Sequence, residues 1–243
     1  MQELPEPGPE DPWEERPEGW RGGTSRRAFV AMCAVGGVVV VLVLVVLFSA
    51  VDGRRGGHGL KGEAMNHAKQ VGMYLIEFAV DYGSFPGDST ATEVAKNSGS
   101  PLDFYDGSSN AVFRQLIAYG CDSEEIFFCR HPEGLRGPDH RISGTHALEA
   151  GEVGFSYVHG QSDSSSPDTP ILLFPMVSSS YDRFWAMEVY REKAMILRAD
   201  LSVDWVPIRE SGQKAVDEHG IPIMDAAQRY LGGSWPDMRH PKF

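Results

Sequence analysis

The sequence predicts an α+β protein in which a single transmembrane helix precedes an amphipathic helix packed on an antiparallel sheet. Three observations lead to this fold class: an uncharged apolar run over 28–51, apolar residues at helical spacing over 60–82, and short β-rich runs after residue 120. Because the helices come first and the strands follow, the long helix is expected to cover one sheet face. A chain of 243 residues can bury one good core.

The first 27 residues form an acidic, proline-rich tail with seven acids, four arginines and five prolines. Such a segment cannot bury enough apolar surface to offset the entropy lost on ordering, so we predict a disordered tail. The whole chain carries a formal net charge of -12 and has no stripe of Lys and Arg. These charges argue against nucleic acid as a partner.

Residues 28–51 contain no charged side chain, and as a helix they would extend for roughly 36 Å. This run is too long for a strand and matches the thickness of a lipid bilayer. Its length and the acidic segment before it are atypical of a cleaved signal peptide, although Ser49-Ala50-Val51 keeps cleavage open as the alternative. We therefore expect an uncleaved membrane anchor with the bilayer as a partner.

Arginines flank both ends of the predicted span, so charge alone leaves the orientation poorly determined. We favour the short tail inside and the large domain on the periplasmic or extracytoplasmic side. Cys121 and Cys129 support this orientation, because cysteines close together in an exported domain commonly pair.

A hinge rich in glycine and arginine, over 52–59, separates the span from a soluble domain over 60–231. The first predicted helix has one apolar face, formed by Leu60, Ala64, Ala68, Val71, Leu75, Phe78 and Tyr82. Gly83 ends this helix and Pro86 prevents it from resuming. A second helix is expected over 109–119, with Ser108 or Ser109 as its cap and Gly120 after its end.

Strands are predicted over 126–129, 153–159, 171–177, 194–199 and 203–208. The last two form a hairpin around residues 200–202. Residues 161–170 read as a polar loop, and 232–243 as an irregular tail.

The order of these elements and the stretch over 66–86 resemble type IV pilin-like proteins and type II secretion pseudopilins. The likeness is to the divergent kind common in planctomycetes and verrucomicrobia, in which an N-x-x-K-Q-x-G helix runs into a Y-x-x-F-P turn. The matching residues here are Asn66, Lys69, Gln70, Gly72, Tyr82, Phe85 and Pro86. Physically, Gly72 permits the close approach of a strand, and Phe85 with Pro86 can fold back over the helix end.

The resemblance implies a structural or interaction protein of the cell envelope, linked to type II secretion or pilus-like assembly. Its partners would be other pilin-like or secretion-system subunits. The chain lacks the usual prepilin cleavage motif, since Gly23 is followed by Thr24-Ser25-Arg26-Arg27 and no acid occurs over 28–51. We therefore expect a pilin-like soluble domain on a conventional anchor.

Two groups of residues have side chains of the type that binds metals. Cys121 and Cys129 favour a disulfide, with free thiols or a metal site as alternatives; the spacing does not match a zinc motif. That metal site would add the histidines at 131, 140 and 146. The acids after residue 100 could bind calcium, but they fit no EF-hand loop and are more often solvated: Asp103, Asp106, Asp122, Glu124 and Glu125.

No nucleophile elbow, metalloprotease motif, phosphate loop or dinucleotide fingerprint occurs in the sequence. His159 is interpreted as a structural histidine at a strand end. We therefore expect no enzyme activity, no cofactor and no metal. The alternative is a signal-anchored envelope enzyme or ligand-binding protein whose site is assembled from residues distant in the sequence.

Overall fold

The computed structural model describes residues 59–134, 136–209, 213–231 and 233–243. All of these belong to one unit, which extends from Arg54 to Phe243. The predicted tail over 1–27, the membrane span over 28–51 and nearly all of the hinge lie outside the described residues. Within the described ranges, no helix is both long and apolar enough to cross a bilayer.

The domain is α+β, as the sequence predicts. It begins with a helix over 59–82. The following elements are α2 (Asp88–Ser98), α3 (Ser109–Tyr119), η1 (Glu125–Phe127), β1 (Ser156–Val158), β2 (Pro170–Phe174), η2 (Glu188–Tyr190), β3 (Lys193–Arg198), β4 (Val203–Arg209), β5 (Lys214–Ala215), α4 (Ile223–Tyr230) and β6 (Met238–Arg239). The strands form one antiparallel sheet in the order β5-β4-β3-β2-β1-β6.

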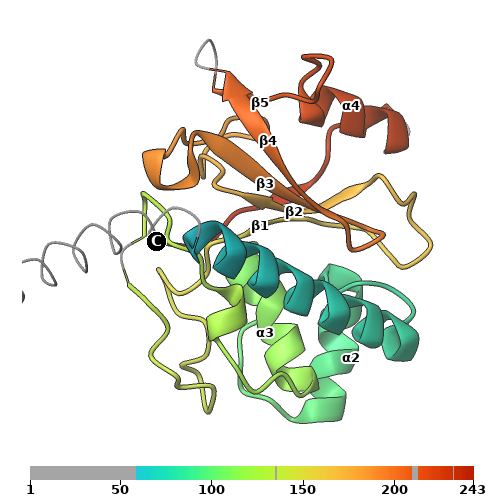
Figure 1. The fold of residues 1–243 in the computed structure, drawn as a ribbon. Coiled ribbons are helices and arrows are strands. Elements are labelled where there is room, and N and C mark those ends of the chain that lie inside the picture. Colours follow the sequence, from blue (N-terminus) through green and yellow to red (C-terminus); the bar gives the residue numbers. More distant parts are fainter. Residues whose placement is uncertain (1–58, 135, 210–212, 232) are drawn as a thin grey trace, which may run out of the picture. The chain divides into compact units, whose positions relative to one another are not determined.

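Helices cover both faces of this sheet (Figure 1). The helix over 59–82, α2 and α3 lie on one face, and α4 lies on the other. The central strands alternate between the two layers: Leu172 and Leu197 join the core under the three helices, whereas Leu173 and Ile196 join the core under α4. Since both faces of β2 and β3 are buried, their sequences are continuous apolar runs.

Both predicted helices are confirmed. The stripe from Ala64 to Phe78 is buried against the sheet, and α3 has the expected bounds. The Ser108 side chain caps α3 by accepting a hydrogen bond from the Ala111 amide. Gly120 follows the last turn with φ 132°, a conformation that favours glycine.

The hairpin of β3 and β4 is confirmed, with Leu197 paired to Val203. Two other strand predictions need correction. The 3-10 helix η1 (Glu125–Phe127) replaces the start of the strand expected over 126–129. The strand β1 covers only Ser156–Val158 of the predicted 153–159. Gly154, just before β1, packs on the segment over 126–129 instead of pairing with a strand: its amide donates to Phe127 O, and a Cβ there would lie 2.6 Å from Cys129 O.

Three further predictions change. The strand expected over 171–177 begins at Pro170 and ends at Phe174, because Pro175 has no amide hydrogen to continue the ladder. A helix that the sequence did not predict, α2, begins just after Pro86. The tail expected to be irregular contains β6, which pairs with β1 and covers its outer edge.

Candidate functional site

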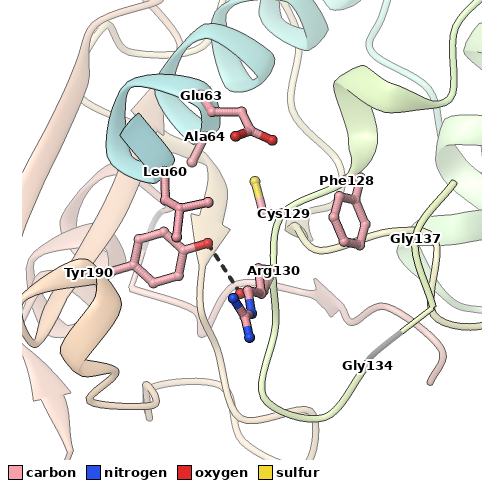
Figure 2. Close-up of a pocket in the computed structure, with 9 residues that line it drawn as sticks. All are labelled: Leu60, Glu63, Ala64, Phe128, Cys129, Arg130, Gly134, Gly137 and Tyr190. Carbon is pink, nitrogen blue, oxygen red and sulfur yellow. Dashed lines mark hydrogen bonds between the residues drawn. The ribbon is translucent and has the colours of Figure 1, made fainter. Parts of the chain in front are cut away.

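A pocket of about 390 Å³ lies at the N-terminal end of the helix over 59–82 (Figure 2). Three segments form its wall: the first helical turns, the loop after η1, and η2. The lining residues are Leu60, Glu63, Ala64, Phe128, Cys129, Arg130, Gly134, Gly137 and Tyr190. Its volume is within the range of small-molecule sites, which is roughly 300–1,000 Å³.

Buried groups form the floor of this pocket and charged groups lie at its rim. The Tyr190 hydroxyl donates to the carbonyl oxygen of Arg130 at 3.2 Å, and burial raises its pKa well above the usual range. Figure 2 shows the Cys129 thiol pointing toward the helix, beside Ala64 and Glu63. Burial, and then the Glu63 carboxylate, raise the pKa of that thiol well above its usual value.

The chemistry that this pocket offers is binding. A thiol held protonated is a poor nucleophile, because the thiolate is the reactive form. None of the lining residues is a histidine that could act as its base. Its walls are mostly apolar and carry one carboxylate and one guanidinium. They therefore suit a small molecule, or part of one, that is apolar along its length and polar at one end.

Cys121 and Cys129 are both free and buried, so the predicted disulfide is not formed in the structure. Their thiols face different surroundings. Cys121 follows α3 directly, and its thiol donates to Ser123 O at 3.5 Å. Cys129 instead faces the pocket and packs against Gly154.

The histidines proposed as zinc ligands are not brought together. His131 is buried and lies 2.9 Å from Met176 O. His140 lies 3.8 Å from Glu125, and His146 lies 3.0 Å from Glu149. Within the described part of the chain, these histidines and the two cysteines form no group that could bind a zinc ion.

The five acids considered for calcium also lie in separate places. Asp106 pairs with Arg114 and Lys242. Burial opposes its ionisation, but hydrogen bonds from Lys242 and Ser108 prevail and lower its pKa. Glu125 is exposed and faces His140. Glu124 alone is buried, and it lies next to two acids that the sequence analysis missed, Asp139 and Glu152.

The family-like residues divide into a buried set and an exposed set. Gly72 packs on the sheet, where a Cβ would lie 2.7 Å from Leu201 Cδ2 and 3.1 Å from Leu197 Cδ2. Tyr82 stacks on Phe78 with ring centroids 4.4 Å apart, and Phe85 is buried. The Pro86 carbonyl accepts a hydrogen bond from Tyr157.

The polar members, Asn66, Lys69 and Gln70, are exposed on the opposite side of the helix. They contribute nothing to the core. The buried members of the stretch position the helix and the turn, and the polar members form part of its outer surface.

Two histidine contacts link segments that are far apart in the chain. His159 lies 3.0 Å from Asp237 and accepts a hydrogen bond from the Asp88 amide, so it joins β1, α2 and the C-terminal segment. Ser156 Oγ lies 3.0 Å from His240 Nδ1. Ser156 is buried. Burial lowers the pKa of His240, whereas the charge of Glu133 and a hydrogen bond to the Ser180 carbonyl act in the opposite direction.

Sequence reasoning missed Glu63, Arg130 and Tyr190 at the pocket, and no local signal marks them. Comparisons of the chain with protein-family models, with curated proteins and with solved structures found no match. The function must therefore be argued from the geometry and the sequence alone.

Proposed function

We propose that this protein is a membrane-anchored, pilin-like structural or interaction protein of the cell envelope. The run over 28–51 would anchor it in the bilayer, and the soluble domain would lie on the extracytoplasmic side. Its partners would be other pilin-like or secretion-system subunits. The observation that carries the proposal is a long helix packed along an antiparallel sheet, directly after a predicted anchor, with its outer face open.

The outer face of this helix supports a role in contact with other proteins. Met73 and Val80 are two turns apart on it and are 51% and 76% exposed. Gln70 and Glu77 lie on the same side and are also exposed. Apolar side chains with a polar border are the composition of a protein contact surface.

The test is site-specific cross-linking of the full chain in native membranes. A photoreactive residue at Met73 or Val80 should give an adduct with a defined protein. The same group at Ile221, which precedes α4 on the other side of the sheet, is the matched control and should not give that adduct. An identical adduct pattern from all three positions would contradict the proposed contact face.

An enzymatic role makes a different prediction. If the purified chain turned over a substrate, and His131, His140 or His159 proved essential while the fold stayed intact, the structural role would be wrong. Circular dichroism and denaturation of each histidine variant would establish that the fold is intact.

A second candidate function, ligand binding, is favoured by the pocket beside Cys129. Ala64 is buried in its wall, so Ala64→Phe should fill part of the cavity. Native mass spectrometry of the purified chain should then show a co-purifying small molecule that the variant lacks. If the wild-type chain carries no such molecule, this second function loses its support.

A further inference from the structure

We infer that Glu124, Asp139 and Glu152 form a binding site for one divalent cation, and that calcium fits it best. Each residue places a carboxylate oxygen within 4.8 Å of the other two. They come from three places in the long segment between α3 and β1, coloured yellow-green in Figure 1. The inference does not depend on the proposed function.

Two of these carboxylates are fully buried, with Glu124 1% and Glu152 0% exposed. Backbone amides satisfy part of their need for hydrogen bonds. Glu124 accepts from Leu148 and Arg141, and Glu152 Oε2 accepts from Glu149. Amides do not cancel charge, however, so adjacent buried carboxylates stay ionised together only with a cation close by. Without one, burial and the neighbouring Glu124 raise the pKa of Glu152.

One oxygen of the group has no hydrogen-bond donor. Glu152 Oε1 is buried and accepts no hydrogen bond. Its nearest cationic group is Arg136, whose Nη2 lies 3.3 Å away but not in hydrogen-bond geometry. The same Nη2 lies 2.8 Å from Asp139 Oδ2, so Oε1 and Oδ2 both face the place that this guanidinium nitrogen occupies.

Arg136 is therefore an incomplete counter-charge. It is shared among three acids, because it also pairs with Glu149 at 2.7 Å. The three cluster carboxylates carry three negative charges when ionised, against one on Arg136, and Glu149 competes for that same guanidinium. The Arg136 side chain is 45% exposed, so it can turn into solvent when another cation enters.

The chemical type of these ligand atoms indicates which kind of ion would bind. A set made only of carboxylate oxygens suits hard cations such as Ca²⁺ and Mg²⁺ rather than zinc or copper. Ca²⁺ takes six to eight oxygen ligands in flexible geometry and readily accepts several carboxylates, whereas Mg²⁺ needs near-ideal octahedral geometry and usually keeps several waters with one or two carboxylates, so three converging carboxylates favour Ca²⁺. Asp139 is half-buried and leaves a side through which water can complete the coordination.

We expect a bound cation to restrict the motion of the segment over 136–152 relative to the C-terminal end of α3. Glu124 lies just after α3, whereas Asp139 and Glu152 lie near the two ends of that segment. A cation between them would add to the hydrogen bonds by which Glu124 already holds Arg141 and Leu148.

The test uses the full chain purified in detergent, treated with EDTA and titrated with CaCl₂. We expect saturable binding of one ion, with a Kd on the order of 10⁻⁴ M, and a rise in the thermal midpoint. Glu152→Gln and Asp139→Asn should each weaken binding by about tenfold or more, because each removes one ligand charge. Asp139 is the less buried of the two, so its variant keeps the test usable if Glu152→Gln does not fold.

Two more variants make the test specific. Glu125→Gln is the matched control, since Glu125 is adjacent to Glu124 but exposed, and it should leave the calcium affinity within about twofold. Arg136→Gln removes the competing guanidinium and should tighten binding, which no loss of folding would do. Absence of saturable calcium binding, or binding that is equal in wild type, Glu152→Gln and Asp139→Asn, would overturn the inference, as would tighter binding of MgCl₂ than of CaCl₂.

Discussion

Gly72 lies where the helix over 59–82 packs closely on the β3–β4 hairpin. A Cβ at this position would lie 2.7 Å from Leu201 Cδ2, inside normal contact distance, and 3.1 Å from Leu197. Leu197 is fully buried in β3 and has no room to move. Because residue 72 has no side chain, the helix lies at this depth without displacing either leucine.

We expect Gly72→Val to lower the free energy of unfolding by about 1–3 kcal/mol, the usual result of overpacking a well-filled core. Gly62→Val is the matched control, because a Cβ at Gly62 meets nothing within 4 Å and the residue lies in the same helix. Urea denaturation followed by tryptophan fluorescence gives both values. Equal effects of the two variants would show that helix propensity, rather than contact with the sheet, decides the result.

His131 shows how burial fixes one protonation state. Its Nδ1 accepts a hydrogen bond from the Glu133 amide, so in the neutral ring Nε2 carries the hydrogen and donates to Met176 O. The ring also stacks on Phe243, with centroids 4.5 Å apart. Burial lowers the pKa of His131 to about 4, although the Met176 carbonyl and Glu133 act in the opposite direction.

This shift predicts a loss of stability in acid. The folded-state pKa lies below the unfolded value of 6.5, so the unfolded chain binds a proton first. Stability is therefore complete above pH 6.5 and falls as the pH drops toward 4, by about 3 kcal/mol at most. His240, which faces His131 and whose pKa burial also lowers, adds to the loss.

Denaturation at pH 7.0, 5.5 and 4.5 checks this prediction. His131→Gln should flatten the dependence in this window, and His219→Gln, at an exposed position, should leave it unchanged. An identical pH dependence of the wild type and His131→Gln would assign the acid sensitivity to other groups.

At the scale of elements, the success of sequence reasoning followed the strength of the local pattern. The helix over 59–82, α3 and the β3–β4 hairpin have clear periodicity and were predicted with nearly the right bounds. The missed helix α2 buries only Thr90, Ala91 and Val94, too few apolar residues for a visible stripe. The strands β5 and β6 have two residues each, so their pairing comes from neighbours and not from their own sequence.

The C-terminal segment contacts the edge strand β1 and the first turn of α3. Met238 and Arg239 pair with β1, and the His240 carbonyl accepts from the Ser109 amide. The Lys242 amide donates to Asn110 Oδ1, which is part of a fully buried side chain. Deleting the segment would leave the Ser109 amide and Asn110 Oδ1 without these hydrogen bonds.

We expect removal of residues 237–243 to destabilise the domain by about 3 kcal/mol or more, since each orphaned buried group costs about 1–3 kcal/mol. Amide hydrogen exchange should rise at Tyr157 and Val158 in β1. Lys242→Ala is the matched control: it removes only the surface ion pair with Asp106 and should cost about 1 kcal/mol or less. A truncated chain as stable as the full one would contradict the role of β6.

At the scale of the whole molecule, the sites were harder to predict than the fold. The pocket joins Glu63, Cys129 and Tyr190, and the acidic group joins Glu124, Asp139 and Glu152. In both, the members come from separate segments and are brought together only by the packing of helices on the sheet. The short spacing also favoured a disulfide between Cys121 and Cys129, whereas both thiols are free and buried.

The last prediction concerns the anchor, which is a property of the whole chain. Residues 28–51 have no charged side chain and follow an acidic segment of 27 residues, unlike the basic start of a cleaved signal. Insertion of such a run in a bilayer is effectively irreversible, because its apolar length matches the hydrocarbon thickness. We therefore expect the chain to stay with membranes through alkaline carbonate washing, and its N-terminal peptides to be present by mass spectrometry.

Substituting two positions of the run should reverse this behaviour. Leu42→Arg together with Val45→Arg places two charges near the centre of the span, each costing about 2.5–3.5 kcal/mol for insertion, and should move the chain to the soluble fraction. Leu60→Arg, just beyond the hinge, is the control and should leave the chain in the membrane. A mature species that begins near Asp52 would instead identify the run as a cleaved signal, and the soluble domain would then act without an anchor.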